Sequence, residues 1–277
     1  MRRARALPAG LPFAPPAARP TVWVCVPTYN EAGNVEVLCH AVLSTLRRAG
    51  IDAHVLVIDD ASPDGTGALA EALAATESRV HVLHRARKEG IGPAYLAGFR
   101  HCLDAGADLV VEMDCDFSHE PRAVPALVGA AAGADLVLGS RYVPGGAVAD
   151  WPLGRRLLSR GGSVYARAVL RLDVRDPTGG LKCFRRAVLD RLVAEDMVAA
   201  GYGFQIEMTY RALLAGHTVR EIPITFRDRT TGTSKMSARI ALEAAVGVAR
   251  LRRLAPPPRT ARPLLRRTRP ATVERAA

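Results

Sequence analysis

The segment Val110-Val111-Glu112-Met113-Asp114-Cys115-Asp116 runs an apolar strand directly into two carboxylates that stand one residue apart. Side chains alternate along an extended backbone, so Asp114 and Asp116 are predicted to face the same side. Carboxylate oxygens suit Mg²⁺ or Mn²⁺, and such ions keep open positions for substrate phosphates. Two acids after a strand can equally begin a turn and cap the helix that Pro121 opens. The choice between a metal site and a turn therefore depends on the surrounding motifs.

Short β-branched segments alternate with helical segments from Thr21 to Gly139, which is typical of βαβ units and a largely parallel sheet in an α/β fold. The expected strands are Val22–Val26, Ala53–Ile58, Val80–Leu83, Leu109–Met113 and Leu136–Leu138. The expected helices are Asn34–Arg48, Gly65–Ala75, Gly92–Asp104 and Pro121–Ala132. Right-handed crossovers place all strand carboxyl ends along one edge of such a sheet.

Three polar segments follow expected strands, at 27–31, 59–66 and 114–116. Because the carboxyl ends of the strands share one edge, these segments are predicted to gather in a single crevice.

The pattern loosens after Gly139. A helix is expected at 204–215, a strand at Thr218–Phe226, a polar loop through Lys235 and a last helix from about Ser237. No internal repeat is evident.

The stretch Leu153–Leu172 combines arginines with an apolar stripe, which predicts either a helix in a membrane interface or a surface helix packed on the sheet. Gly161 and Gly162 argue against one unbroken helix there.

The positive charge of the chain lies at its two ends. Of a net charge of +11, residues 1–20 supply four arginines and no acid, and residues 250–277 supply nine arginines against Glu274. Residues 21–249 therefore sum to −1. Both ends are rich in Pro and Ala, which favours extended, weakly structured tails.

The predicted organisation is a single α/β domain between two basic tails. The tails occupy 1–20 and 251–277, and the domain occupies 21–250. Within the domain, two halves are expected, at 21–140 and at 141–250.

Arginine-rich tails suit a polyanionic surface. Each basic residue close to an anionic membrane contributes about 1 kcal/mol of binding free energy. Only three lysines stand beside 35 arginines, so codon bias in a GC-rich genome is a competing explanation of the arginine content. Aromatic residues make up only 5% of the chain and no finger spacing is present, so no nucleic-acid partner is expected.

The five cysteines, Cys25, Cys39, Cys102, Cys115 and Cys183, form no C-x-x-C pair and indicate reduced structural thiols in a cytosolic protein. No signal peptide is expected, and no stretch approaches the ~20 apolar residues of a membrane span. The predicted location is therefore peripheral, at the cytoplasmic face of a membrane.

In order and spacing, the motifs resemble those of the polyprenyl-phosphate mannosyltransferases (dolichol-phosphate type) of glycosyltransferase family 2, over about residues 21–240. The specific combination is the segment 113–121, Arg85 and Lys88 before 90–95, the segment 201–207 and the segment 229–236. The resemblance implies a GT-A fold, a GDP-mannose donor, Mg²⁺ or Mn²⁺, a polyprenyl monophosphate acceptor and inversion at the sugar carbon.

The resemblance also implies that 21–140 is a nucleotide-binding half and 141–250 an acceptor-side half, and it implies a set of site residues. Donor-nucleotide roles fall on Pro27, Tyr29, Glu31, Asp59, Asp60, Lys88, Asp114, Cys115, Arg229 and Lys235. Metal binding falls on Asp114, Asp116 and Ser118, acceptor-phosphate binding on Arg141, Arg155 and Ser159, and the sugar end of the pocket on Asp176 and Gln205. The residues expected to carry catalysis are Asp116, Arg141, Arg155 and Lys235.

Some residues depart from the family pattern. Gly179 and Lys182 stand where many relatives carry Ser and Arg, Cys115 replaces the usual Ala, and Ser118 replaces a Gln found in some relatives. Lys keeps the positive charge but loses the bidentate geometry of Arg. Cys115 is expected to be a small buried residue, since neighbouring carboxylates raise the pKa of a thiol.

The site is expected to act by positioning the acceptor phosphate and by stabilising the charge of the departing nucleotide. A lipid monophosphate is already largely dianionic near neutral pH, so its attack on the sugar carbon needs no strong general base. Arginines would aim the acceptor phosphate while the cation and Lys235 stabilise charge on the departing nucleotide. His119 is expected to orient the two aspartates.

Two other functions are open at this stage: a polyprenyl-phosphate glucosyltransferase that uses UDP-glucose, and a non-enzymatic scaffold that binds anionic membrane and keeps a transferase-like core. A membrane-embedded partner protein is also expected, because the chain has no membrane span of its own.

Overall fold

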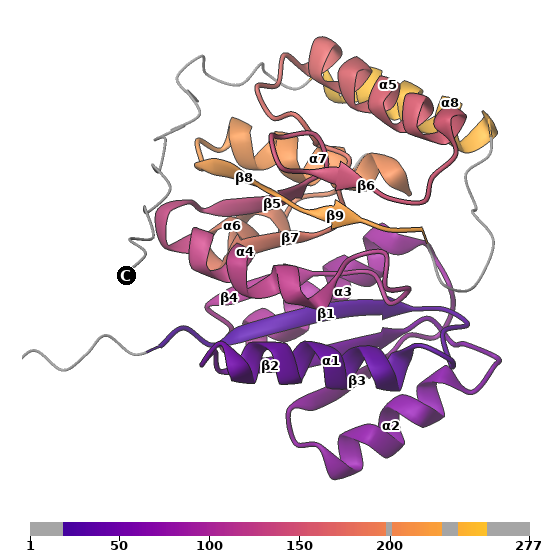
Figure 1. Cartoon of the computed structure of the whole chain (residues 1–277), viewed down its shortest axis with the longest axis vertical. Coiled ribbons are helices and arrows are strands. Elements are labelled where there is room, and N and C mark those ends of the chain that lie inside the picture. Colours follow the sequence, from indigo (N-terminus) through magenta and orange to yellow (C-terminus); the bar gives the residue numbers. More distant parts are fainter. Residues whose placement is uncertain (1–18, 198–200, 229–237, 254–277) are drawn as a thin grey trace, which may run out of the picture.

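The computed structural model describes residues 19–197, 201–228 and 238–253. Residues 1–18 and 254–277, which make up most of the two predicted tails, lie outside this range. Within it, a central sheet carries helices on both faces (Figure 1).

The main sheet has seven strands in the order β3-β2-β1-β4-β7-β5-β8. All neighbouring strands are parallel except β7, which is antiparallel to both β4 and β5. The strands are β1 (Val22–Thr28), β2 (Ala53–Asp59), β3 (Val80–His84), β4 (Leu109–Glu112), β5 (Leu136–Ser140), β7 (Lys182–Arg185) and β8 (Val219–Pro223). A two-stranded sheet pairs β6 (Ala147–Val148) with β9 (Thr225–Phe226).

The helices fall close to their predicted positions in the first half of the chain. They are α1 (Val35–Arg48), α2 (Thr66–Thr76), α3 (Ile91–Asp104), and α4 (Val124–Ala130) between the 3-10 turns η1 (Pro121–Ala123) and η2 (Ala131–Gly133). The second half adds α5 (Leu153–Leu170), α6 (Arg186–Leu192), α7 (Tyr202–Leu214) and α8 (Ala238–Leu251).

Alternation along β1 separates the two layers of the core. Val24 and its neighbours at alternate positions pack with α1, α2 and α4 on one face of the sheet. Cys25 and Trp23 point to the other face, where α3, α6 and α7 cover them. Burial of both faces explains why β1 is apolar throughout, as parallel strands usually are.

Helix α5 runs unbroken through Gly161 and Gly162, so the predicted interruption is wrong. Its buried side chains, including Ala166 and Leu170, pack in a cluster with α7 and α8, and this packing outweighs the low helix propensity of glycine. Figure 1 shows α5 beside α8, at the end of the sheet away from β3. None of the helices within the described ranges is both long and apolar enough to cross a bilayer.

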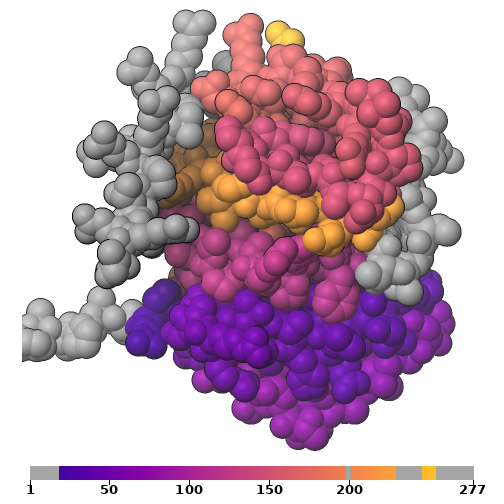
Figure 2. Space-filling view, viewed as in Figure 1, coloured from indigo at the N-terminus to yellow at the C-terminus, as the bar shows by residue number. Residues whose placement is uncertain are grey.

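Three elements were not expected from the sequence, and the first of them is the two-residue strand β6. Strand β7 and helix α6 fill the stretch 182–192, and β7 joins β4 to β5. The single strand predicted at 218–226 is instead divided into β8 and β9, which belong to different sheets. Figure 2 shows the resulting stack, with the earlier segments in indigo and purple below and the segments after β5 above.

Candidate functional site

The two aspartates of the D-x-D motif follow β4 in a bend. The strand ends at Glu112, one residue earlier than predicted, and Phe117 adopts a left-handed φ of 57°. The carboxylate of Asp116 accepts a hydrogen bond from the backbone N–H of Ser118 at 3.0 Å. A turn, rather than the predicted extended geometry, therefore sets the positions of the two carboxylates.

Three side chains converge on the backbone of Gly180, which lies in the loop before β7. A Cβ at Gly180 would lie 3.5 Å from Cε1 of His119, 3.6 Å from Oδ2 of Asp114 and 3.8 Å from Nε2 of Gln205. The loop 176–180 thus brings the D-x-D segment and α7 to one place. The space between these side chains and Gly180 is about the size of one methyl group.

Gly179 is packed against backbone. A Cβ there would lie 3.0 Å from the carbonyl oxygen of Gly139, so even a serine side chain would displace that strand end. This close approach accounts for glycine at one of the positions that depart from the family pattern.

His119 is buried and neutral beneath the D-x-D bend. Its Nδ1 accepts a hydrogen bond from the backbone N–H of Asp114 at 3.4 Å, and its ring packs edge-on against Phe226 at 5.1 Å. Burial lowers the pKa of His119 to about 4, against the opposing effect of Asp116. A neutral imidazole that accepts from the Asp114 backbone is the orienting role that the sequence predicted.

Arg141, directly after β5, forms a buried two-pronged ion pair with Asp176. Its Nε and Nη2 donate to the two carboxylate oxygens at 2.8 and 2.7 Å, and its backbone N–H donates to Oδ2 at 2.9 Å. Nη2 also donates to Thr178 at 2.7 Å. The pKa of Asp176 is lowered because pairing with Arg141 outweighs the desolvation that opposes it. Two predicted site residues therefore bind each other and fix the 176–180 loop to β5.

Arg155 lies in the first turn of α5 and is more accessible than Arg141. Its side chain is 25% exposed against 7% for Arg141. Nη1 donates to Asp228 at 2.8 Å, and the guanidinium lies 4.0 Å from the ring centre of Trp151.

Ser159, one turn after Arg155 on the same helix, accepts a hydrogen bond from the hydroxyl of Tyr142 at 2.8 Å. All three residues predicted to bind the acceptor phosphate thus contact aromatic side chains, since the guanidinium of Arg141 lies 5.1 Å from the ring centre of Tyr142.

The donor-side residues lie at the carboxyl ends of β1 and β2. The ammonium of Lys88 stands 3.7 Å above the ring of Tyr29, and Ser62 donates to Asp59 at 2.5 Å. Asp60 accepts from Arg85 at 2.6 Å.

Glu31 accepts from Asn34 at 2.8 Å, at the start of α1. Pro27, half-buried near the end of β1, completes the set that the structure gathers at this edge. These residues therefore lie along the edge where the strands end, as the polarity of the strands predicted.

Cys115 is buried between the two aspartates, and desolvation, followed by nearby acidic groups, raises the pKa of its thiol well above the ordinary value. This agrees with a packing role rather than a nucleophilic one. Arg229 and Lys235, predicted to contact the diphosphate, lie outside the described residues.

A buried ion pair beside the site was not predicted. Nζ of Lys182 in β7 lies 3.3 Å from the carboxylate of Glu112 in β4, and neither side chain is exposed. Lys182 also donates to the backbone carbonyl of Gln205 at 2.8 Å and to its side-chain Oε1. The only signal in the sequence is a lysine in an apolar run, at a position where many relatives carry arginine.

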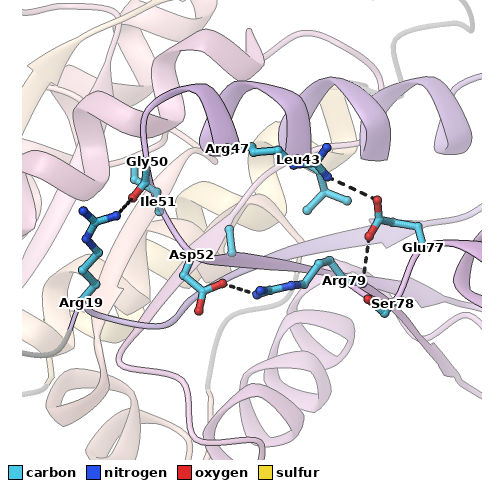
Figure 3. A pocket seen from close by; sticks show the side chains of 10 residues that line it. Arg19, Leu43, Arg47, Gly50, Ile51, Asp52, Glu77, Ser78 and Arg79 are labelled. Atoms are coloured by element: carbon cyan, nitrogen blue, oxygen red, sulfur yellow. Dashed lines mark hydrogen bonds and ion pairs between the residues drawn. The ribbon is translucent and has the colours of Figure 1, made fainter.

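A groove of about 440 Å³ lies at the opposite edge of the sheet, beside the starts of β2 and β3 (Figure 3). Its charged groups pair with one another: Arg47 with Glu77 at 3.4 Å, and Arg79 with Asp52. It holds none of the predicted site residues.

Comparison with known proteins identifies the family of this chain. The profile described as Glycosyl transferase family 2 matches residues 23–193. The chain belongs to glycosyltransferase family 2.

This family 2 chain is 46% identical over 229 residues to the undecaprenyl-phosphate mannosyltransferase of Micrococcus luteus, covering 83% of this chain and 93% of that relative. It is also 46% identical over 239 residues to the polyprenol monophosphomannose synthase of Mycolicibacterium smegmatis, covering 85% and 89%. The resemblance drawn from the motifs is confirmed.

Solved structures confirm the GT-A fold of this family 2 enzyme. Glucosyl-3-phosphoglycerate synthase from Mycobacterium tuberculosis, in complex with Mn²⁺, UDP and phosphoglyceric acid, matches with a TM-score of 0.61 at 22% identity, covering 87% of this chain and 80% of that chain. The same enzyme with Mg²⁺ and UDP matches with a TM-score of 0.56 at 24% identity, covering 77% and 73%.

The D-x-D segment offers oxygen donors to a divalent cation. The hydroxyl of Ser118 is buried and has no hydrogen-bond partner in the described part of the chain, beside the carboxylates of Asp114 and Asp116. No group of three His, Cys, Asp or Glu side chains suited to a metal occurs in the described ranges. The arrangement therefore fits a hard cation that takes its other ligands from a diphosphate and water.

Proposed function

We propose that this enzyme transfers mannose from GDP-mannose to a polyprenyl monophosphate, with inversion at the sugar carbon. The observation that supports it most strongly is 46% identity, over nearly the full length, to enzymes named for polyprenyl-phosphate mannosyl transfer. Asp114 and Gln205 both approach the backbone of Gly180, so the predicted cation site and the residue predicted for the sugar end of the pocket lie close together.

The donor nucleotide would occupy the edge formed by β1 and β2. Tyr29 and Lys88 form a cation–π pair there, and Asp59 ends β2 with Asp60 directly after it, where base and ribose would lie. The diphosphate would then extend toward Asp114.

A Mg²⁺ or Mn²⁺ ion held by Asp114, Asp116 and Ser118 would supply charge stabilisation for the departing nucleotide. The structural relatives with Mn²⁺ or Mg²⁺ and UDP support a divalent cation in this fold. Arg229 and Lys235 are proposed to assist from the segment that follows β9.

The acceptor phosphate is proposed to enter from the α5 side. Arg155 is the accessible guanidinium, so an incoming phosphate would displace Asp228 from it. Arg141 is held by Asp176 and contributes positive charge from a fixed position, and the Ser159 hydroxyl lies next to the Tyr142 hydroxyl. The acceptor phosphate is already anionic, so its attack on the sugar carbon would need no general base. Catalysis would then depend on positioning of the phosphate and on charge stabilisation.

Helix α5 is proposed to rest on an anionic membrane surface at its cytoplasmic face. Its exposed side chains include Leu153 at 72%, Leu157 at 63% and Val164 at 54%, and basic residues such as Arg156 and Arg160 share the exposed part of the helix. Apolar anchors flanked by arginines suit an anionic lipid interface. A membrane-embedded partner protein remains part of the proposal.

A donor-by-acceptor screen tests the proposal. Purified enzyme is incubated with radiolabelled GDP-mannose or UDP-glucose, with C50 or C55 polyprenyl phosphate, and with Mg²⁺, Mn²⁺ or EDTA. The expected product is a mannolipid that requires the cation. If glucolipid forms without mannolipid, the donor is UDP-glucose rather than GDP-mannose. If no combination of donor and acceptor gives a lipid-linked sugar, the non-enzymatic scaffold is favoured.

A further inference from the structure

The indole ring of Trp151 supports the guanidinium of Arg155. The Cζ atom of Arg155 lies over the ring, 4.0 Å from its centre. Trp151 is 9% exposed and the Arg155 side chain 25%, so the ring is the buried partner and the cation the accessible one. A guanidinium over an aromatic face is attracted by the negative face of the ring. The contact therefore restrains Arg155 without burying its charge.

The anion that Arg155 binds in the structure marks a place for the acceptor phosphate. Nη1 donates to Oδ1 of Asp228 at 2.8 Å while the guanidinium stays over the ring. Carboxylate and phosphate oxygens accept from a guanidinium in the same way. A phosphate oxygen can thus take the position of Oδ1 with Arg155 still on Trp151.

The ring of Trp151 is held by packing. It meets the ring of Phe226 edge-on, with centres 5.2 Å apart, and the backbone carbonyl of Phe226 in β9 accepts from the N–H of Ala149 at 2.8 Å. Asp150, between β6 and Trp151, adopts a left-handed φ of 60°, which aspartate tolerates better than most residues. The indole N–H is buried without a hydrogen-bond partner in the described ranges, so the ring contributes through its faces and edges.

Phe226 also contacts the second guanidinium predicted for the acceptor. The Cζ atom of Arg141 lies 5.5 Å from the centre of the Phe226 ring. Arg141 is fixed by its two hydrogen bonds to Asp176. Arg141 and Arg155 therefore lie over two rings that touch each other, and this pair of rings sets the position of one guanidinium relative to the other.

We propose that Trp151 is a positioning residue for the acceptor, which holds Arg155 in place relative to Arg141 so that both can meet one phosphate group. Without the ring, the long Arg155 side chain would lose its rotamer freedom only when the phosphate binds, and this entropy loss would weaken binding. The inference rests on the proposed function for the identity of the acceptor.

Steady-state kinetics test the proposal. Trp151→Leu is expected to raise KM for polyprenyl phosphate about fivefold, the scale of one cation–π contact, with KM for the nucleotide sugar unchanged. Trp151→Phe keeps an aromatic face and should recover most of the loss. In an Arg155→Ala background, Trp151→Leu should change KM for the lipid by less than about twofold, because the residue through which it acts is gone.

Trp23→Leu is the control, since it truncates the other tryptophan of the chain. Trp23 is 4% exposed, and its indole N–H likewise has no hydrogen-bond partner among the described residues. This variant should lower Tm, as Trp151→Leu does, yet leave KM for polyprenyl phosphate unchanged. The same rise in KM in both leucine variants, or in Trp151→Phe and Trp151→Leu, would overturn the proposal.

A binding measurement without turnover separates this inference from the proposed function. Calorimetric titration with farnesyl monophosphate, in the absence of nucleotide sugar, should give a Kd about fivefold weaker for Trp151→Leu than for the wild type. Farnesol, which lacks the phosphate, should not distinguish the two proteins. Equal Kd values for farnesyl monophosphate, or no binding by the wild type, would overturn the inference even if mannolipid forms. A fivefold difference in Kd, with no lipid-linked sugar in the donor screen, would overturn only the proposed function.

Discussion

The guanidinium of Arg141 and the carboxylate of Asp176 bind each other through two hydrogen bonds of 2.8 and 2.7 Å, in the interior of the protein. Asp176→Ala would leave Arg141 as an uncompensated buried cation. We expect the free energy of unfolding to fall by about 3–5 kcal/mol, measured by urea unfolding. Asp173→Ala, at an exposed position nearby, is the control and should change it by less than about 0.5 kcal/mol. Equal stability of the two variants would show that the pair is not structural.

The D-x-D motif should be needed for turnover but not for folding. Asp116→Ala is expected to lower kcat/KM by about a thousandfold, the scale of losing a dominant charge-stabilising group. Tm should stay within a few degrees of the wild type. Asp104→Ala, at the exposed end of α3, is the comparison variant. Retained lipid-linked product in Asp116→Ala would remove the motif from the mechanism.

Arg155 and Arg156 are adjacent on α5, but only Arg155 contacts Trp151 and Asp228 in the described residues. Arg155→Ala is expected to raise KM for polyprenyl phosphate about tenfold or more, because a hydrogen bond to a charged group is lost. KM for the nucleotide sugar should not change. Steady-state kinetics of Arg155→Ala and Arg156→Ala decide the matter, and identical KM values in both variants would argue against the assignment.

Acid should weaken the fold through a histidine pair on the α3 side of the sheet. Nδ1 of His54 lies 2.9 Å from Nε2 of His81, both rings pack against Trp23, and His101 and Arg79 face the same cluster. Asp52, which pairs with Arg79, opposes these effects on His54. Burial, followed by neighbouring positive groups, lowers the pKa of both His54 and His81 below the ordinary value of 6.5.

The unfolded chain therefore binds protons at these positions more readily than the folded protein. Their contribution to stability is complete above about pH 6.5 and is lost as the pH falls below it. In His54→Gln/His81→Gln the difference in unfolding free energy between pH 7.5 and 5.5 should be smaller than in the wild type. His40→Gln, on the exposed face of α1, is the comparison. An unchanged pH slope in the double variant would refute this account.

The exposed leucines of α5 should matter for membrane binding. Leu157→Glu is expected to reduce co-sedimentation with anionic vesicles severalfold, because it removes an apolar contact and adds a repelled charge. Val37→Glu places the same change on α1, where the valine is 60% exposed, and should have no effect. Deletion of residues 1–18 and 254–277 tests the tails separately. Binding that survives both changes would place the membrane contact elsewhere.

Local pattern was sufficient to predict most of the first half of the fold. The strands and helices up to β5 lie within a few residues of their expected bounds, because each shows clear periodicity and ends at a turn motif. The clustering of Tyr29, Asp59 and Asp114 at one edge followed from strand polarity alone.

The remaining features depend on contacts between residues distant in the chain, which the sequence alone does not reveal. The burial of Lys182 is explained only by Glu112, which lies opposite it in the sheet. The pairing of Arg141 with Asp176, and the continuity of α5 through Gly161, likewise depend on neighbours distant in the chain. Long-range pairing decided each of these cases against local propensity.

The antiparallel strand β7 has a consequence for synthesis of the chain. It lies between β4 and β5 but follows both in sequence, so neither strand has its shared neighbour until residues 182–185 have emerged from the ribosome. Until then the growing chain presents unpaired backbone edges that can pair with other chains. Fragments that stop before residue 182 should accordingly aggregate during expression.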